Sequence, residues 1–100
     1  MARFDVYRLP GSKMLVLDIQ ADLFSDLSSR AIIPLIEADI AAREAMPRLK
    51  PTLSIDRVHY RMITTDIAAV PSNLLTDLDC NLEDQHGTII DAIDFLLQGF

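Results

Sequence analysis

The sequence predicts a mostly β fold, a small antiparallel sheet or barrel covered by one C-terminal α-helix. Three observations predict it: an N-terminal pair of apolar segments joined by Pro10-Gly11-Ser12, a second pair of alternating segments joined by Asp56-Arg57, and a helical apolar stripe at the end of the chain. The chain has 100 residues, of which 50% are hydrophobic, and a formal net charge of −6. This composition excludes intrinsic disorder, and the length predicts a single domain over residues 1–100.

The N-terminal segments form the first predicted hairpin. Residues 2–9 alternate in part, with Phe4 and Val6 on one face, and predict a half-buried strand. Pro10 and Gly11 suit the two central positions of a turn, because proline presets a negative φ and glycine accepts a positive one. Residues 13–20 are rich in β-formers and return as the second strand.

A polar segment, residues 22–29, follows as a predicted loop and carries two adjacent apolar residues, Leu23 and Phe24. The simplest interpretation is that these two side chains plug the edge of the core. Residues 30–36 then predict a third strand. Pro34 lies inside it, and because proline has no N–H to donate, we expect it on an edge or at a bulge.

Residues 37–46 favour helix by composition, yet their large apolar residues are Ile40 and Met46, so the segment is interpreted as a helix or an irregular arm. A short connector, bracketed by prolines, leads into the second predicted hairpin, with strands at residues 52–55 and 58–63. Leu53 and Ile55 alternate inward in the first of them. Residues 72–79 give no clear pattern.

The last segment predicts a helix from about Glu83 to the end of the chain. Its apolar stripe consists of Ile89, Ile90, Ile93, Leu96, Leu97 and Phe100. Chain ends are usually polar and frayed. Apolar residues that continue to the last position therefore need a partner, or a second copy of the chain, to bury them.

Several classes of function are disfavoured by composition. The nine basic residues form no run, so direct binding to nucleic acid is not expected of this acidic chain. The longest apolar runs, such as residues 14–17, are far too short to span a membrane. A single cysteine, Cys80, cannot form an internal disulfide, and this indicates a reducing cytoplasm. We expect no metal site, no cofactor and no catalytic residue, because the corresponding motifs are absent.

The densest polar cluster lies after the second hairpin and consists of Arg61, Thr64, Thr65 and Asp66. One interpretation uses Arg61 to bind an anion that the threonines position. The simpler one is that the Thr and Asp side chains cap the end of the strand through hydrogen bonds to the backbone. Cys80, His59 and His86 are interpreted as ordinary side chains.

The same region resembles the CcdB family of bacterial toxins through the motif Arg61-Met-Ile-Thr-Thr-Asp-Ile-Ala-Ala-Val-Pro71. The resemblance extends to Phe4-Asp-Val-Tyr7, Val16-Leu-Asp-Ile-Gln-Ala-Asp22, Ile33-Pro34-Leu35 and residues 89–99, with nearly unshifted spacing. It implies an SH3-like antiparallel barrel of the CcdB/MazF type, with a small β wing in part of residues 37–46.

The resemblance also implies a function. Proteins of this family are cytoplasmic homodimers that poison DNA gyrase by binding its A subunit, and a CcdA-like antitoxin neutralises them. Carried over to matching positions, the gyrase-binding residues are Leu23, Phe24, Asp94, Leu97, Gln98, Gly99 and Phe100.

One position departs from the family pattern. Gln98 stands where the family has a tryptophan that stacks on an arginine of gyrase, so the exchange forfeits a cation–π contact of about 0.5–2 kcal/mol. Asp94 stands where the family has an amide. The negative charge of Asp94 suits a basic target surface. Two alternatives therefore stay open: a MazF-like mRNA-cleaving ribonuclease using Arg61, Thr64 and Thr65, and a weakened toxin that mainly binds antitoxin and takes part in operon autoregulation.

Overall fold

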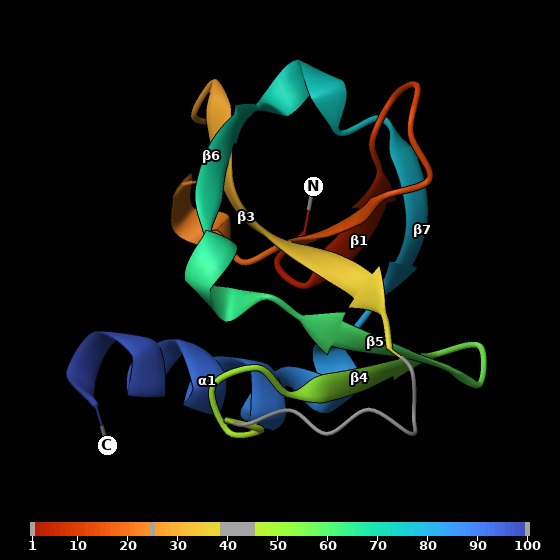
Figure 1. Ribbon diagram of the computed structural model, residues 1–100. Coiled ribbons are helices and arrows are strands. Elements are labelled where there is room, and N and C mark those ends of the chain that lie inside the picture. The colour runs from red at the N-terminus through yellow and green to blue at the C-terminus, as the bar shows by residue number, and fades with distance from the viewer. Residues whose placement is uncertain (1, 25, 39–45, 100) are drawn as a thin grey trace.

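The computed structural model describes residues 2–24, 26–38 and 46–99 (Figure 1). In this part of the chain, seven strands form one antiparallel sheet that curls on itself, and the helix α1 (His86–Gln98) lies below it in Figure 1. The neighbouring strands run in the order β4-β5-β3-β2-β1-β7, and β6 pairs separately with β3. The predicted class, a mostly β protein with a C-terminal helix, is confirmed.

The first hairpin consists of β1 (Asp5–Arg8) and β2 (Leu15–Asp18), with Val6 opposite Leu17 and both side chains fully buried. Gly11 occupies the turn with a φ of 72°. The first strand begins later than predicted because Phe4 also adopts a φ of 72°, which breaks the extended backbone. Its N–H instead donates to the carbonyl of Asp18 at 2.7 Å.

The central strand is β3 (Ser29–Glu37), and it changes its neighbour along its length. Residues 29–32 pair with β6 (Ala68–Pro71), whereas residues 35–37 pair with β5 (Val58–Met62). Pro34 lies between these two stretches and opposite Val16 of β2. The prediction of an edge or a bulge was therefore wrong: the proline is tolerated inside the sheet because its missing N–H coincides with the change of neighbour.

The second hairpin joins β4 (Thr52–Ile55) to β5 as predicted. Asp56 and Arg57 both adopt positive φ, 49° and 68°, which is the geometry of the tight hairpin turn whose twist matches that of the strands. Leu53 and Ile55 are buried, which confirms their inward alternation. The predicted helix, arm or wing at residues 37–46 lies mostly outside the described residues; Glu37 itself belongs to β3 and pairs with Tyr60.

Two strands were missed by the sequence analysis. β6 is built largely from small residues, and β7 (Asp77–Asn81) has the sequence Asp-Leu-Asp-Cys-Asn, which is poor in β-branched residues. Both are stabilised by pairing: β7 with β1, where Cys80 lies opposite Val6, and β6 with β3. The unassigned residues 72–79 thus form the 3₁₀ turn η3 (Ser72–Leu74) and the start of β7.

The main core lies between the sheet and α1, and a second, smaller cluster fills the other side of the sheet around Tyr7, Val16, Ile32 and Leu75.

A fully buried ion pair joins β2 to β3. Arg30 donates from Nη2 and Nε to Oδ2 of Asp18, at 2.6 and 3.0 Å.

Burial at this pair shifts the pKa values of nearby groups. Burial raises the pKa of Asp18, and the hydrogen bonds from Arg30 oppose that shift. Burial also raises the pKa of Tyr7 to about 12, with help from the hydrogen bond that its hydroxyl donates to Asp5 at 3.2 Å. Nη1 of Arg30 has no hydrogen-bond partner in the described residues.

None of the helices in the described residues is long and apolar enough to cross a membrane.

Candidate target-binding surface

Helix α1 is fixed to the barrel through its first half. Ile89 and Ala92 are fully buried, and Ile90 and Ile93 pack against the main core. The 3₁₀ turn η4 (Glu83–Gln85) precedes the helix, and there the Gln85 side chain exchanges two hydrogen bonds with the backbone of Ser54, at 3.0 and 2.8 Å. The start of the helix is thereby tied to β4.

The last turn of α1 extends beyond the barrel (Figure 1). Leu97 is 75% exposed, and Gln98 is exposed as well. The predicted apolar stripe is thus buried at Ile89, half-buried at Leu96 and exposed at Leu97, where the sequence predicts contact with a partner. An exposed leucine beside an amide leaves apolar surface available to a partner.

Gly99 ends the helix in the left-handed conformation, with a φ of 78°, and its N–H donates to the carbonyl of Phe95 at 2.8 Å. This is a helix-ending geometry that glycine adopts without strain. It fixes the direction in which the chain leaves the last turn. Phe100, also predicted to bind the target, lies outside the described residues.

We predict opposite effects for alanine at the two helical glycines. Gly99→Ala places a side chain at positive φ, which costs about 1–2 kcal/mol of conformational free energy. The end of the helix avoids this cost by fraying. Amide exchange at residue 99 should therefore rise several-fold by NMR, whereas Gly99→Asn should stay close to wild type. Gly87→Ala is the matched control: no atom lies within 4 Å of the added Cβ, so it should stabilise the protein by roughly 0.5–1 kcal/mol. Equal effects at both glycines would contradict this account.

The second candidate element is the 3₁₀ turn η1 (Asp22–Phe24). Leu23 is 85% exposed and Phe24 51% exposed, so the interpretation that they plug the core edge was wrong. The turn is nevertheless held by hydrogen bonds: the N–H of Phe24 donates to Ala21 at 2.9 Å, and the Gln20 side chain donates to the carbonyl of Phe24 at 2.8 Å. Two apolar side chains are therefore presented to solvent on an ordered loop.

In the view of Figure 1, η1 and the C-terminal half of α1 lie on the same side of the molecule. The 3₁₀ turn η2 (Thr64–Asp66) contacts both α1 and β3 between them. Ile67, which follows η2, is 43% exposed, and Leu27, after η1, is 54% exposed. Neither residue was predicted to bind a partner, although Ile67 directly follows the polar turn η2.

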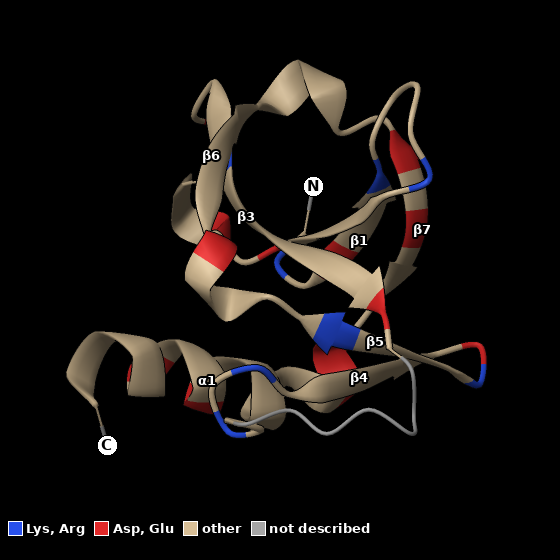
Figure 2. Ribbon diagram, viewed as in Figure 1, with Lys and Arg blue, Asp and Glu red and all other residues tan. Residues whose placement is uncertain are grey.

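The charge on α1 is of one sign. The helix carries Asp91 and Asp94 and no Lys or Arg (Figure 2). Asp94 is exposed and belongs to the predicted binding residues. Asp91 is paired with Arg48, so Asp94 is the helix carboxylate that suits a partner presenting basic and apolar groups.

The polar cluster after the second hairpin is not an open anion site. Thr64 is fully buried, and its hydroxyl lies 3.4 Å from the carbonyl of Met62, as the capping interpretation predicted. Thr65 is exposed and Arg61 is half-buried in β5. Burial raises the pKa of the Cys80 thiol to about 12, with Asp79 adding to the shift, so the thiolate is strongly disfavoured at neutral pH.

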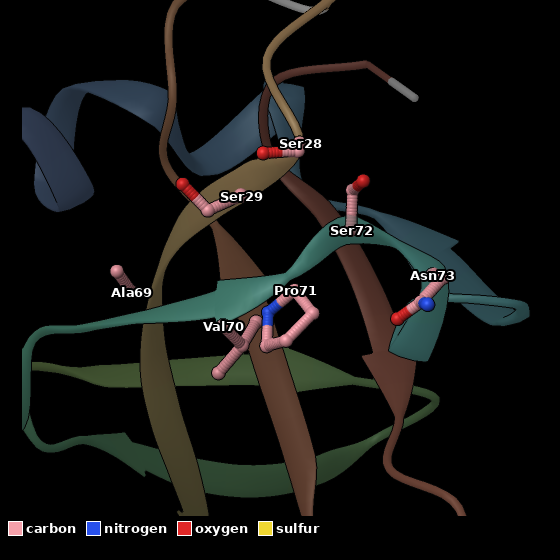
Figure 3. Close-up of a pocket in the computed structure, with 7 residues that line it drawn as sticks. All are labelled: Ser28, Ser29, Ala69, Val70, Pro71, Ser72 and Asn73. Atoms are coloured by element: carbon pink, nitrogen blue, oxygen red, sulfur yellow. The ribbon is translucent and has the colours of Figure 1, made fainter.

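A surface depression of ≈ 450 Å³ lies where β6 meets the start of β3 (Figure 3). It is lined by Ser28, Ser29, Ala69, Val70, Pro71, Ser72 and Asn73. Its lining offers hydroxyl and amide groups but no titratable side chain. This depression therefore has no acid or base of its own.

Fold and surface together define a class: a small curled β-sheet protein that carries the most exposed apolar groups of its described residues, Leu23 and Leu97, on a turn and a helix end. A comparison with known protein families assigns the chain to one of them. The model of the family described as CcdB protein matches residues 3–99 of the 100-residue chain. The chain belongs to the CcdB family, and this membership supports the class of toxin–antitoxin toxins.

Proposed function

We propose that this protein is the toxin of a type II toxin–antitoxin system and that it poisons DNA gyrase by binding the gyrase A subunit. The observation that carries the proposal is the last turn of α1, which projects beyond the barrel with Leu97 75% exposed. Gln98 and Gly99 continue this surface. Leu23 and Phe24 supply a second apolar contact.

The proposed mechanism is binding rather than group transfer. Burial of Leu97 and Leu23 against gyrase supplies apolar contact of about 1.5–3 kcal/mol for each side chain that becomes fully covered. Asp94 supplies electrostatic complementarity to a basic partner, which speeds association and selects among partners. Trapping gyrase after it has cut DNA then blocks replication.

We further propose that residues 1–100 act as one domain, that the toxin is a cytoplasmic homodimer, and that a cognate CcdA-like antitoxin neutralises it. A twofold axis presents each binding surface twice, so each contact with a symmetric target is made twice.

A matched pair of substitutions tests the proposal. Leu23→Ser removes an exposed apolar side chain from the proposed surface, whereas Met14→Ser removes one that is 44% exposed and directly precedes β2. We expect induced expression of the wild type to arrest growth and co-expressed antitoxin to relieve the arrest. Leu23→Ser should weaken binding to purified gyrase A about tenfold or more, and Met14→Ser should not.

Two outcomes would contradict the proposal. Equal effects of the two substitutions would remove Leu23 from the binding surface. Normal growth at high expression, together with intact antitoxin binding, would favour the weakened toxin that acts in autoregulation.

A further inference from the structure

Arg48 connects the segment before β4 to the middle of α1 at Asp91 and to its last turn at Phe95. Its Nε and Nη2 donate to the two carboxylate oxygens of Asp91, at 3.1 and 3.2 Å. The same guanidinium lies over the ring of Phe95, with Cζ 4.6 Å from the ring centroid. One side chain therefore contacts two residues that are one helical turn apart.

The backbone that carries Arg48 is itself fixed. The N–H groups of Leu49 and Lys50 donate to the carbonyl of Met46, at 3.1 and 3.0 Å, and form a turn. Pro51, at the end of this turn, is buried, and its carbonyl accepts a hydrogen bond from the N–H of Met62 in β5 at 2.9 Å. The sheet therefore fixes the backbone position of Arg48, and the Arg48 side chain in turn restrains α1.

The helix needs such a contact at this end. Asp94 directly precedes the last turn of α1, and that turn contains no basic residue to complement the helix dipole. Asp91 lies at the middle of the helix, between the buried Ile89 and Ala92. Ile93 still packs against the main core, whereas Leu97 in the last turn is 75% exposed. Arg48 therefore supplies from outside the cation that the helix sequence lacks.

We propose that Arg48 is a positioning residue for the last turn of α1, holding Leu97, Gln98 and Gly99 in one orientation through Asp91 and Phe95. This inference rests on the proposed function for its biological meaning, because a preorganised surface binds its target with less loss of conformational entropy. Arg48 itself need not touch the target.

Hydrogen exchange of the free protein tests the positioning role without gyrase. Arg48→Ala should raise exchange at residues 95–99 about three- to tenfold and leave the amides of β1–β3 unchanged. Lys13→Ala is the matched control, because it removes the same charge from the turn between β1 and β2, away from the C-terminal end of α1 in Figure 1. Unchanged exchange at residues 95–99 in Arg48→Ala would overturn the proposal.

Non-additivity is the second readout. If Arg48 acts through Asp91, the effect on exchange of Arg48→Ala with Asp91→Asn should be no larger than that of Arg48→Ala alone, whereas independent roles would add. Arg48→Lys should rescue only in part, because lysine keeps the charge but loses the planar, two-pronged contact. Additive effects, or full rescue by lysine, would contradict the proposed geometry.

Binding to gyrase A separates this inference from the proposed function. With both correct, Arg48→Ala should weaken binding about three- to tenfold, with Lys13→Ala unchanged. If the wild type fails to bind gyrase A but the exchange pattern appears as predicted, the proposed function falls and the positioning role stands. If gyrase binds and the exchange pattern is absent, the positioning role falls alone.

Discussion

Deletion of residues 98–100 should abolish gyrase poisoning while leaving the barrel folded. The deletion removes Gln98 and the left-handed end of the helix at Gly99, both exposed, and it lets Leu97 fray. None of the deleted residues that the structure describes contributes to the core. We expect a loss of gyrase A binding of about a hundredfold and no growth arrest, with an unfolding midpoint close to that of wild type.

A gain-of-binding substitution checks the same surface from the opposite direction. Gln98→Trp introduces the aromatic ring that the resemblance to the family implies there and should strengthen gyrase binding by about 0.5–2 kcal/mol, or roughly 2- to 30-fold. Titration of gyrase A by isothermal calorimetry measures both variants on one scale. A deletion variant that still arrests growth would remove the helix end from the mechanism, whatever the effect of tryptophan.

Breaking the buried ion pair should have the largest effect on stability. Asp18→Asn leaves the fully buried guanidinium of Arg30 without its carboxylate, and Arg30→Met leaves the carboxylate of Asp18 without its cation. Each change should cost about 3–5 kcal/mol, because an uncompensated buried charge has lost its solvation and its partner. Against a total stability of about 5–15 kcal/mol, either variant would be only marginally folded.

Removing both charges together should be far less costly. The double variant Asp18→Leu with Arg30→Met replaces the pair by apolar groups, a change that is often neutral or even stabilising for buried ion pairs. It also removes Nη1 of Arg30, which has no hydrogen-bond partner in the described residues. Urea unfolding of the two single variants and the double variant measures the coupling. Additive losses would show that the pair is not the unit of stability.

The local patterns that predicted the fold were those that depend on neighbouring residues. Alternation gave the two hairpins, and Asp56-Arg57 adopts the positive φ values of a tight turn. Strands that depend on distant partners were not predictable. The sequence of β7 is largely polar, and the segment forms a strand because it pairs with β1. Pro34 was misplaced for the same reason, since the change of neighbour along β3 is a property of the whole sheet.

The candidate site was predictable to a similar extent. The resemblance to the CcdB family picked out Leu23, Phe24 and Leu97, and all three are exposed. What the sequence could not supply was which residues of the apolar stripe the sheet covers: Ile89 is buried, whereas Leu97 is 75% exposed. The contact between Arg48 and Asp91 joins residues 43 positions apart and carries no local signal.

Trapping of DNA cleavage complexes tests the central claim most directly. Purified protein is incubated with gyrase and supercoiled plasmid, the reaction is stopped with detergent and protease, and linear DNA is measured on a gel, with an RNA substrate incubated in parallel. The account predicts linear DNA that rises with toxin concentration, is absent with the 98–100 deletion, and is accompanied by intact RNA. Cleaved RNA, or no linear DNA at toxin concentrations that arrest growth, would contradict it.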